Sequence, residues 1–129
     1  MVKRFAALLI VLAIPGCGTD ASARDARESV ERFYAAVESR DGAAACEELS
    51  EDASSALETS EGKPCEDAVL SLELTPAAVA TDSVWVTSAQ VSLQSGDTAF
   101  LDQIGGDWKI GAVGCHPLPG QPYECELDG

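Results

Sequence analysis

The sequence predicts an α+β fold in which N-terminal helices pack on one face of an antiparallel β-meander. Between residues 25 and 72, apolar residues recur at steps of three and four, which is the period of helices with one buried face. After Pro76, β-branched residues alternate with polar ones, and short turns that contain Gly or Asp separate the runs. Because the helices precede the strands instead of alternating with them, we expect the helices on one face of the sheet.

The first 16 residues have the features of a signal peptide. Lys3 and Arg4 precede an uninterrupted apolar run, FAALLIVLAI, at residues 5–14. Ten residues rise only about 15 Å as a helix, roughly half of a bilayer core, so this run is too short to span a membrane. We therefore expect residues 1–16 to direct export and to be removed.

The apolar run ends in Ile14-Pro15-Gly16-Cys17. This order of an aliphatic residue, a tolerant position, a small residue and a cysteine resembles the lipobox of bacterial lipoproteins. The resemblance implies that the Cys17 thiol receives a diacylglyceryl group and that residues 17–24 form a lipidated N-terminus and a short tether. Two acyl chains hold firmly, so we expect a lipid-anchored protein on the extracytoplasmic face of the cell membrane. The alternative is an ordinary signal peptide followed by a chance cysteine.

The mature chain is strongly acidic. Removal of residues 1–16 leaves six basic residues against 22 acidic ones, a formal charge of −16. Nucleic-acid binding is excluded, because it depends on neutralisation of phosphates by Lys and Arg. Electrostatic membrane binding is excluded as well, which leaves the lipid as the tether. We interpret the charge as a solvated surface; an acidic binding site is the alternative.

Residues 25–129 are long enough for one domain with a modest core. The first helix is expected over Asp25–Arg40, ended by Asp41-Gly42, and Asp41 is a plausible N-cap for the next helix. Three shorter helices are expected over residues 43–49, over residues 52–59, and from Pro64 to Leu70 or Leu72.

Three strands are expected next, over residues 83–93, 98–104 and 108–115. Tight turns at residues 94–97 and 105–107 join them into the meander. The tail, residues 116–129, contains three prolines and cannot form a regular central strand for most of its length.

Four cysteines remain once Cys17 is set aside: Cys46, Cys65, Cys115 and Cys125. Export places them in an oxidising compartment. Four cysteines allow three connectivities, which sequence alone leaves open, and proximity in the chain favours Cys46–Cys65 and Cys115–Cys125. A zinc site is disfavoured, because the chain has no C-x-x-C motif and one histidine. We expect no metal and no other cofactor.

Several motifs together resemble one superfamily. They are VERFYAAVESRDGAAACEELSEDASSAL at residues 30–57, GKPC at residues 62–65, WKIGAVGC at residues 108–115, and the ending GC-x-P-x-P-x-x-P-Y-x-C. The chain resembles the NTF2-like (SnoaL-like, cystatin-like cone) superfamily, and more closely uncharacterised actinobacterial lipoproteins of that fold. The resemblance implies that residues 25–129 form an NTF2-like domain with a curved meander.

Superfamily enzymes work inside the cone pocket, with carboxylates and a tyrosine or with an Asp/His pair. The residues that this resemblance brings near a pocket are Tyr34, Trp85, Asp102 and Trp108. None matches a catalytic pattern residue by residue, so we assign no catalytic residue. From the residues alone, Tyr34 is expected at the core edge with its hydroxyl at the surface, Asp102 on a solvated strand face, both tryptophans in the core, and His116 in an exposed loop.

One acidic cluster, Glu47, Glu48, Glu51 and Asp52, is interpreted as the solvated face of a helix. It lacks the alternating oxygen ligands and the central glycine of a calcium-binding loop.

Three functions compete. The favoured one is a non-enzymatic, lipid-anchored binding or accessory module whose partner is a membrane protein or a small apolar molecule. The second is an isomerase, cyclase or dehydratase that uses the cone pocket, which requires a carboxylate of raised pKa or a histidine facing a cavity. The third is a spacer without a specific ligand.

Overall fold

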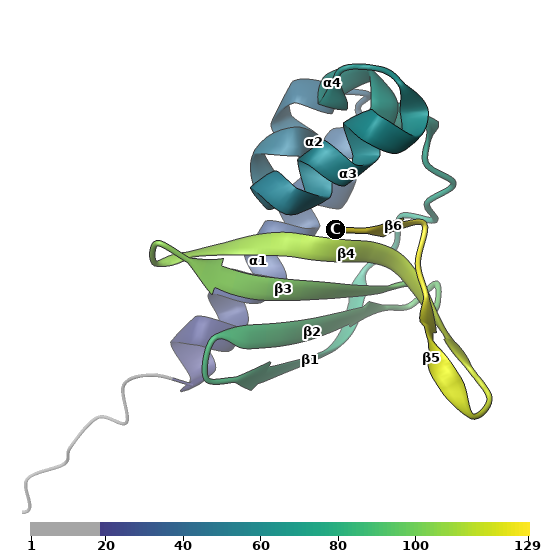
Figure 1. The fold of residues 1–129 in the computed structure, drawn as a ribbon. Coiled ribbons are helices and arrows are strands. Elements are labelled where there is room, and N and C mark those ends of the chain that lie inside the picture. Colours follow the sequence, from purple (N-terminus) through teal and green to yellow (C-terminus); the bar gives the residue numbers. More distant parts are fainter. Residues whose placement is uncertain (1–18) are drawn as a thin grey trace, which may run out of the picture.

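The computed structural model describes residues 19–129, which form helices followed by a curved antiparallel sheet (Figure 1). The predicted α+β class is therefore confirmed. The helices are α1 (Thr19–Glu38), α2 (Gly42–Glu48), α3 (Glu51–Glu61) and α4 (Cys65–Ala68), which continues as the 3-10 turn η1 (Val69–Ser71). The strands are β1 (Val79–Trp85), β2 (Ser88–Leu93), β3 (Thr98–Ile104), β4 (Asp107–Leu118), β5 (Gln121–Glu124) and β6 (Leu127–Asp128).

The strands follow the order β1-β2-β3-β4-β5, and β6 pairs with β4 beside Val113. Helix α1 lies across one face of the sheet, whereas α2, α3 and α4 gather beside β4 and β6 (Figure 1). The sheet curves where the register of β3 and β4 shifts between Thr98 and Phe100. Gly114 lies in that shift with φ 66, and a Cβ there would come within 2.8 Å of Leu74 and Glu126. Only glycine fits this position without displacing its neighbours.

The core lies between α1 and the sheet. The apolar face predicted for the first helix is buried at Ala26, Val30, Phe33 and Tyr34. It packs against side chains of the inner sheet face, among them Val91, Leu101, Ile110 and Val113. Alternate residues on the same strands, Ser88, Asp102 and Lys109, face outward in register with Trp85 of β1.

Two disulfide bonds are present within residues 19–129. Cys46–Cys65 joins α2 to α4, and Cys115–Cys125 joins β4 to the segment after β5. This is the connectivity that proximity in the chain favours. The second bond and the β4–β6 pairing together hold the Pro-rich tail against the sheet.

The first helix begins earlier than expected. Residues 19–24, part of the expected tether, are the first turns of α1. Their sequence, TDASAR, contains two alanines, which favour helix, and Asp20 complements the positive end of the helix dipole. The expected N-cap is confirmed, since the Asp41 carboxylate accepts from the backbone N–H of Ala44 at 3.1 Å.

The expected strand over residues 83–93 is wrong. The chain turns at Val86-Thr87, so that β1 and β2 form a hairpin. The sequence has no Gly, Asn or Pro at this point, and Val86 itself takes the positive φ of 53° that the turn requires. A β-branched residue in this conformation is an outlier, and for this reason the sequence pattern did not predict the turn.

The Pro-rich tail supplies the end of β4, the edge strand β5 and the short β6. Pro122 lies in β5, where a missing N–H is tolerated because the strand is at the sheet edge. No helix within residues 19–129 has the length and apolarity needed to cross a membrane.

Candidate functional site

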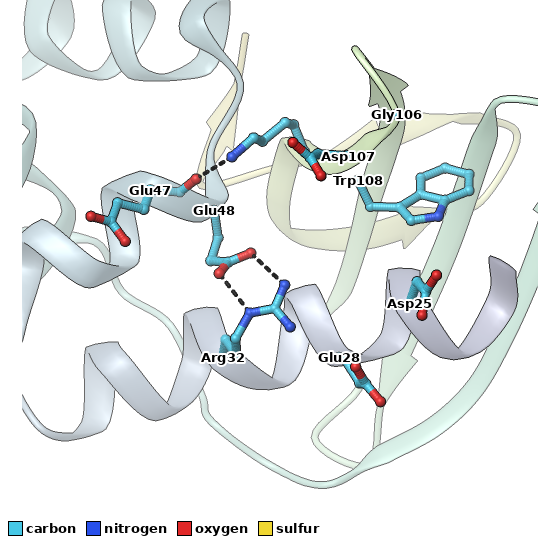
Figure 2. Close-up of a pocket in the computed structure, with 9 residues that line it drawn as sticks. Asp25, Glu28, Arg32, Glu47, Glu48, Gly106, Asp107 and Trp108 are labelled. Carbon is cyan, nitrogen blue, oxygen red and sulfur yellow. Dashed lines mark hydrogen bonds and ion pairs between the residues drawn. The ribbon is translucent and has the colours of Figure 1, made fainter. Parts of the chain in front are cut away.

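A strongly charged cleft lies between α1, the end of α2 and the β3–β4 turn (Figure 2). We call it the acidic cleft. Its volume is about 340 Å³, and it is lined by Asp25, Glu28, Arg32, Glu47, Glu48, Gly106, Asp107, Trp108 and Lys109. Five carboxylates face two cations, so the cleft carries a net negative charge.

One ion pair crosses the acidic cleft. Arg32 donates from Nε and Nη2 to the two oxygens of Glu48, at 2.7 and 3.2 Å, as Figure 2 shows. The buried hydroxyl of Ser29 donates to the same carboxylate at 2.7 Å. Burial by itself raises the pKa of Glu48, but the hydrogen bonds from Arg32 and Ser29 outweigh it and hold the pKa below its usual range. Glu48 is therefore ionised and used structurally, and it is no candidate for a general acid.

The second cation of the cleft, Lys109, also has a hydrogen-bond partner within the domain. Lys109 Nζ donates to the backbone oxygen of Glu47 at 2.6 Å. The remaining carboxylates of the cleft, those of Asp25, Glu28, Glu47 and Asp107, form no ion pair with described residues 19–129. The acidic cleft therefore offers negative charge that the domain itself does not neutralise.

Trp108 closes the base of the cleft beside the start of α1 (Figure 2). Its side chain is buried, as expected for a core tryptophan, with 6% of the residue exposed. The indole N–H has no hydrogen-bond acceptor among the described residues. Such a group costs about 1–3 kcal/mol, and the structure shows no compensating contact for it.

A second cluster was not anticipated from the sequence. Asp97, only 2% exposed, accepts from the Tyr34 hydroxyl at 3.4 Å and from the Thr75 backbone N–H at 3.2 Å. Its other oxygen lies 3.0 Å from His116 Nε2. Burial, followed by the nearby Asp97 carboxylate, raises the pKa of Tyr34 above its usual range. The phenol is therefore a neutral donor to a buried carboxylate.

The structure corrects three expectations for single residues. Tyr34 lies inside the core, with its hydroxyl on Asp97, instead of at the surface. Trp85 is 57% exposed at the end of β1, because its position on the strand faces outward in register with Ser88. His116 belongs to β4 and contacts Asp97, although its side chain is exposed as expected.

The four residues named for a pocket do not share one. Tyr34 lines a cleft beside β1, and Trp108 lines the acidic cleft on the other side of α1. Asp102 is exposed on the outer sheet face, where Ser88 Oγ donates to it at 2.6 Å. The expectation of a solvated strand position for Asp102 is met.

The acidic helix cluster is divided. Glu47, Glu51 and Asp52 are exposed, whereas Glu48 is mostly buried by its contacts with Ser29 and Arg32. Within residues 19–129, no group of His, Cys, Asp or Glu is arranged to hold a metal ion. Cys17 and the expected signal peptide lie outside the described residues.

Asp97 was missed because its partners are distant in sequence. It appears as the last residue of a Ser-Gly-Asp turn, and it is 63 positions from Tyr34. A buried aspartate at the start of a strand differs in no local feature from a solvated turn residue.

Comparison with known proteins gave no relative: no family model matches the chain, and neither a curated protein nor a solved structure matches it significantly.

Proposed function

We propose that this chain is a lipid-anchored binding or accessory domain on the extracytoplasmic face of a bacterial membrane, with an NTF2-like fold and no catalytic activity. The lipobox resemblance at residues 14–17 supports the anchor, and the order of helices and curved meander supports the fold. The proposed partner is a membrane protein that presents a basic surface.

The observation that carries the non-enzymatic proposal is the filled space between α1 and the sheet. Phe33, Leu101, Ile110 and Val113 are all at most 1% exposed there. Within this core a small apolar ligand would have to displace packed side chains, which costs about 1–3 kcal/mol. The cleft beside β1, of about 300 Å³, is open to such a ligand, but we favour a protein partner because the free carboxylates of the acidic cleft suit a basic protein surface.

The acidic cleft supports the choice of partner. Its free carboxylates are surface groups, and opposite charge on a partner would accelerate and orient association. Because the attraction acts between exposed charges, we expect it to weaken as the salt concentration rises.

A photo-crosslinking amino acid at Glu28, in the full chain in living cells, tests this function. We expect one crosslinked membrane protein from Glu28 and none from Glu58, an exposed carboxylate on α3 that serves as the matched control position. Charge reversal by Asp107→Lys should remove the adduct. Identical adducts from Glu28 and Glu58 would contradict the assignment of the cleft.

One observation favours the second candidate, an isomerase, cyclase or dehydratase. A buried carboxylate that holds one imidazole nitrogen leaves the other nitrogen available, which is the arrangement of a general base. Asp97 and His116 have this geometry, and 55% of the His116 side chain is exposed. However, the clefts described above are lined by neither residue. Turnover of an isolated small molecule that His116→Ala abolishes, in a folded protein, would establish the enzyme and refute the binding module.

A further inference from the structure

The β1–β2 hairpin ends in two exposed apolar residues. Trp85 is 57% exposed and Val86 is 92% exposed. Val86 also has φ 53, a left-handed conformation that glycine would adopt with less strain. The side chain makes almost no contact within the domain, so packing does not explain the strained valine. Strain of this kind at an exposed position points to a contact outside the chain.

The hairpin tip lies at the same end of the domain as the beginning of α1. Helix α1 and strand β1 are antiparallel neighbours: Tyr34 and Val79 line one cleft, and further along Arg27 forms an ion pair with Asp82. Trp85 is three residues beyond Asp82, about 10 Å along the strand. Figure 1 shows the β1–β2 turn and the first turn of α1 at one end of the molecule. The β3–β4 turn, with exposed Ile104, lies at that end too.

The chain that precedes α1 leads to this same end. Cys17 is two residues before Thr19, which limits the separation of their Cα atoms to about 7 Å. Any membrane that holds the N-terminus through Cys17 therefore meets the domain at the end where Trp85 and Val86 are exposed.

The charge next to the hairpin tip differs from the rest of the chain. The cleft between the start of α1 and β1 is lined by two carboxylates, Asp20 and Asp82, and two guanidinium groups, Arg24 and Arg27. This edge is formally neutral in a strongly acidic domain. Asp102, the nearest carboxylate on the outer sheet face, is two strands away, about 10 Å. This edge therefore adds no net charge against a lipid surface, and the carboxylates of the acidic cleft lie on the other flank of α1.

From these observations we propose that the Trp85-Val86 tip inserts into the interfacial region of the phospholipid bilayer that holds the anchor. Tryptophan suits this region, because its ring is apolar and its N–H remains near water. The insertion rests on the proposed lipid anchor and adds an orientation to it. The hairpin and the acidic cleft lie on opposite flanks of α1, so the inserted tip leaves the cleft open to a neighbouring membrane protein.

The test uses the full, lipidated protein in phosphatidylcholine vesicles with brominated acyl chains, which quench tryptophan fluorescence on contact. The difference between wild type and Trp85→Phe gives the emission of Trp85, and the variant itself reports the buried Trp108. We expect bromine to remove most of the Trp85 emission and to leave that of Trp108 unchanged. Unquenched Trp85 in a protein whose mass shows lipid on Cys17 would overturn the insertion and leave the anchor intact.

Two variants separate insertion from a structural role of the hairpin. Val86→Gly relieves the strained conformation, so we expect a higher unfolding temperature together with weaker quenching of Trp85. Leu118→Ser, a change of an exposed apolar residue in the β4–β5 hairpin, should leave the quenching unchanged. Quenching that survives Val86→Gly, or shielding of Trp85 in native membranes but not in protein-free vesicles, would refute the bilayer as the partner of the tip.

Discussion

Replacement of Asp97 by alanine should be one of the most destabilising single changes in the domain. The Tyr34 hydroxyl is buried, and without Asp97 it loses its acceptor, which costs about 1–3 kcal/mol. The Thr75 N–H is only partly buried, so the loss of its hydrogen bond to Asp97 adds about 1 kcal/mol to the destabilisation. The loss of the contact between Asp97 and the exposed His116 side chain adds less than about 1 kcal/mol to the destabilisation.

Together these contributions predict a loss of about 2–5 kcal/mol for Asp97→Ala. For a domain of this size the loss lowers the unfolding temperature by roughly 8–20 °C. The free-energy loss is measured by urea unfolding of the full oxidised protein, followed by circular dichroism. Tyr34→Phe should cost about 1 kcal/mol, because it removes the donor together with its need for a partner.

The double variant Asp97→Ala with Tyr34→Phe provides the control. It should be less destabilised than the sum of the single variants, because no buried hydroxyl is left without an acceptor. A loss below about 1 kcal/mol for Asp97→Ala would refute this account of the cluster. A gain in stability would show that the buried Asp97 carboxylate destabilises the folded domain, as carboxylates in catalytic sites often do. That result would favour the second candidate function, an enzyme.

Three further predictions concern stability. Replacing Cys46 and Cys65, or Cys115 and Cys125, by serine should cost about 3 kcal/mol per bond in the chain-entropy description, measured by urea unfolding; equal stability of the reduced and oxidised wild type would contradict this. Gly42→Ala should cost about 1–3 kcal/mol in the same assay, because its Cβ would lie 1.8 Å from the backbone oxygen of Glu66, and an unchanged midpoint would show that α4 moves freely. Because the pKa of Glu48 is lowered in the folded state, its contribution is present above the unfolded value of 4.5 and is lost as the pH falls through the folded-state pKa. In Glu48→Gln, the free energy of unfolding should therefore fall less steeply than in wild type as the pH decreases below 4.5. An equally steep fall in the variant would count against a stabilising Arg32–Glu48 pair.

Local patterns in the sequence predicted the helices and two of the turns between strands. The apolar period of residues 26–37, the Asp41 cap and the Gly-containing turns at residues 94–97 and 105–107 each depend on neighbours within a few positions. Such neighbours interact in the same way whether or not the rest of the fold is known. The β1–β2 turn was not predicted, because Val86 takes a positive φ that β-branched residues disfavour and no Gly, Asn or Pro marks the turn in the sequence.

The candidate sites are formed by residues that are far apart in the sequence, so the sequence predicted them less completely than the helices. Tyr34 and His116 were both noted separately, but the buried carboxylate that joins them, Asp97, is indistinguishable in sequence from a turn residue. Trp85 was expected in the core, since alternation along a strand does not say which of its two faces is buried when the turn is misplaced. The acidic cleft needs residues of α1, α2 and β4 that only the packed fold brings together.

The proposed function and the proposed insertion both require that a membrane holds the chain by its N-terminus. The intact mass of the protein extracted from bacterial membranes, without reduction and after thiol alkylation, tests this directly. We expect a chain that begins at Cys17, carries the mass of a lipid there, and has four further cysteines that alkylate only after reduction. A product that starts elsewhere, or an unmodified Cys17 in an aqueous fraction, would contradict the anchor and the membrane-bound function built on it.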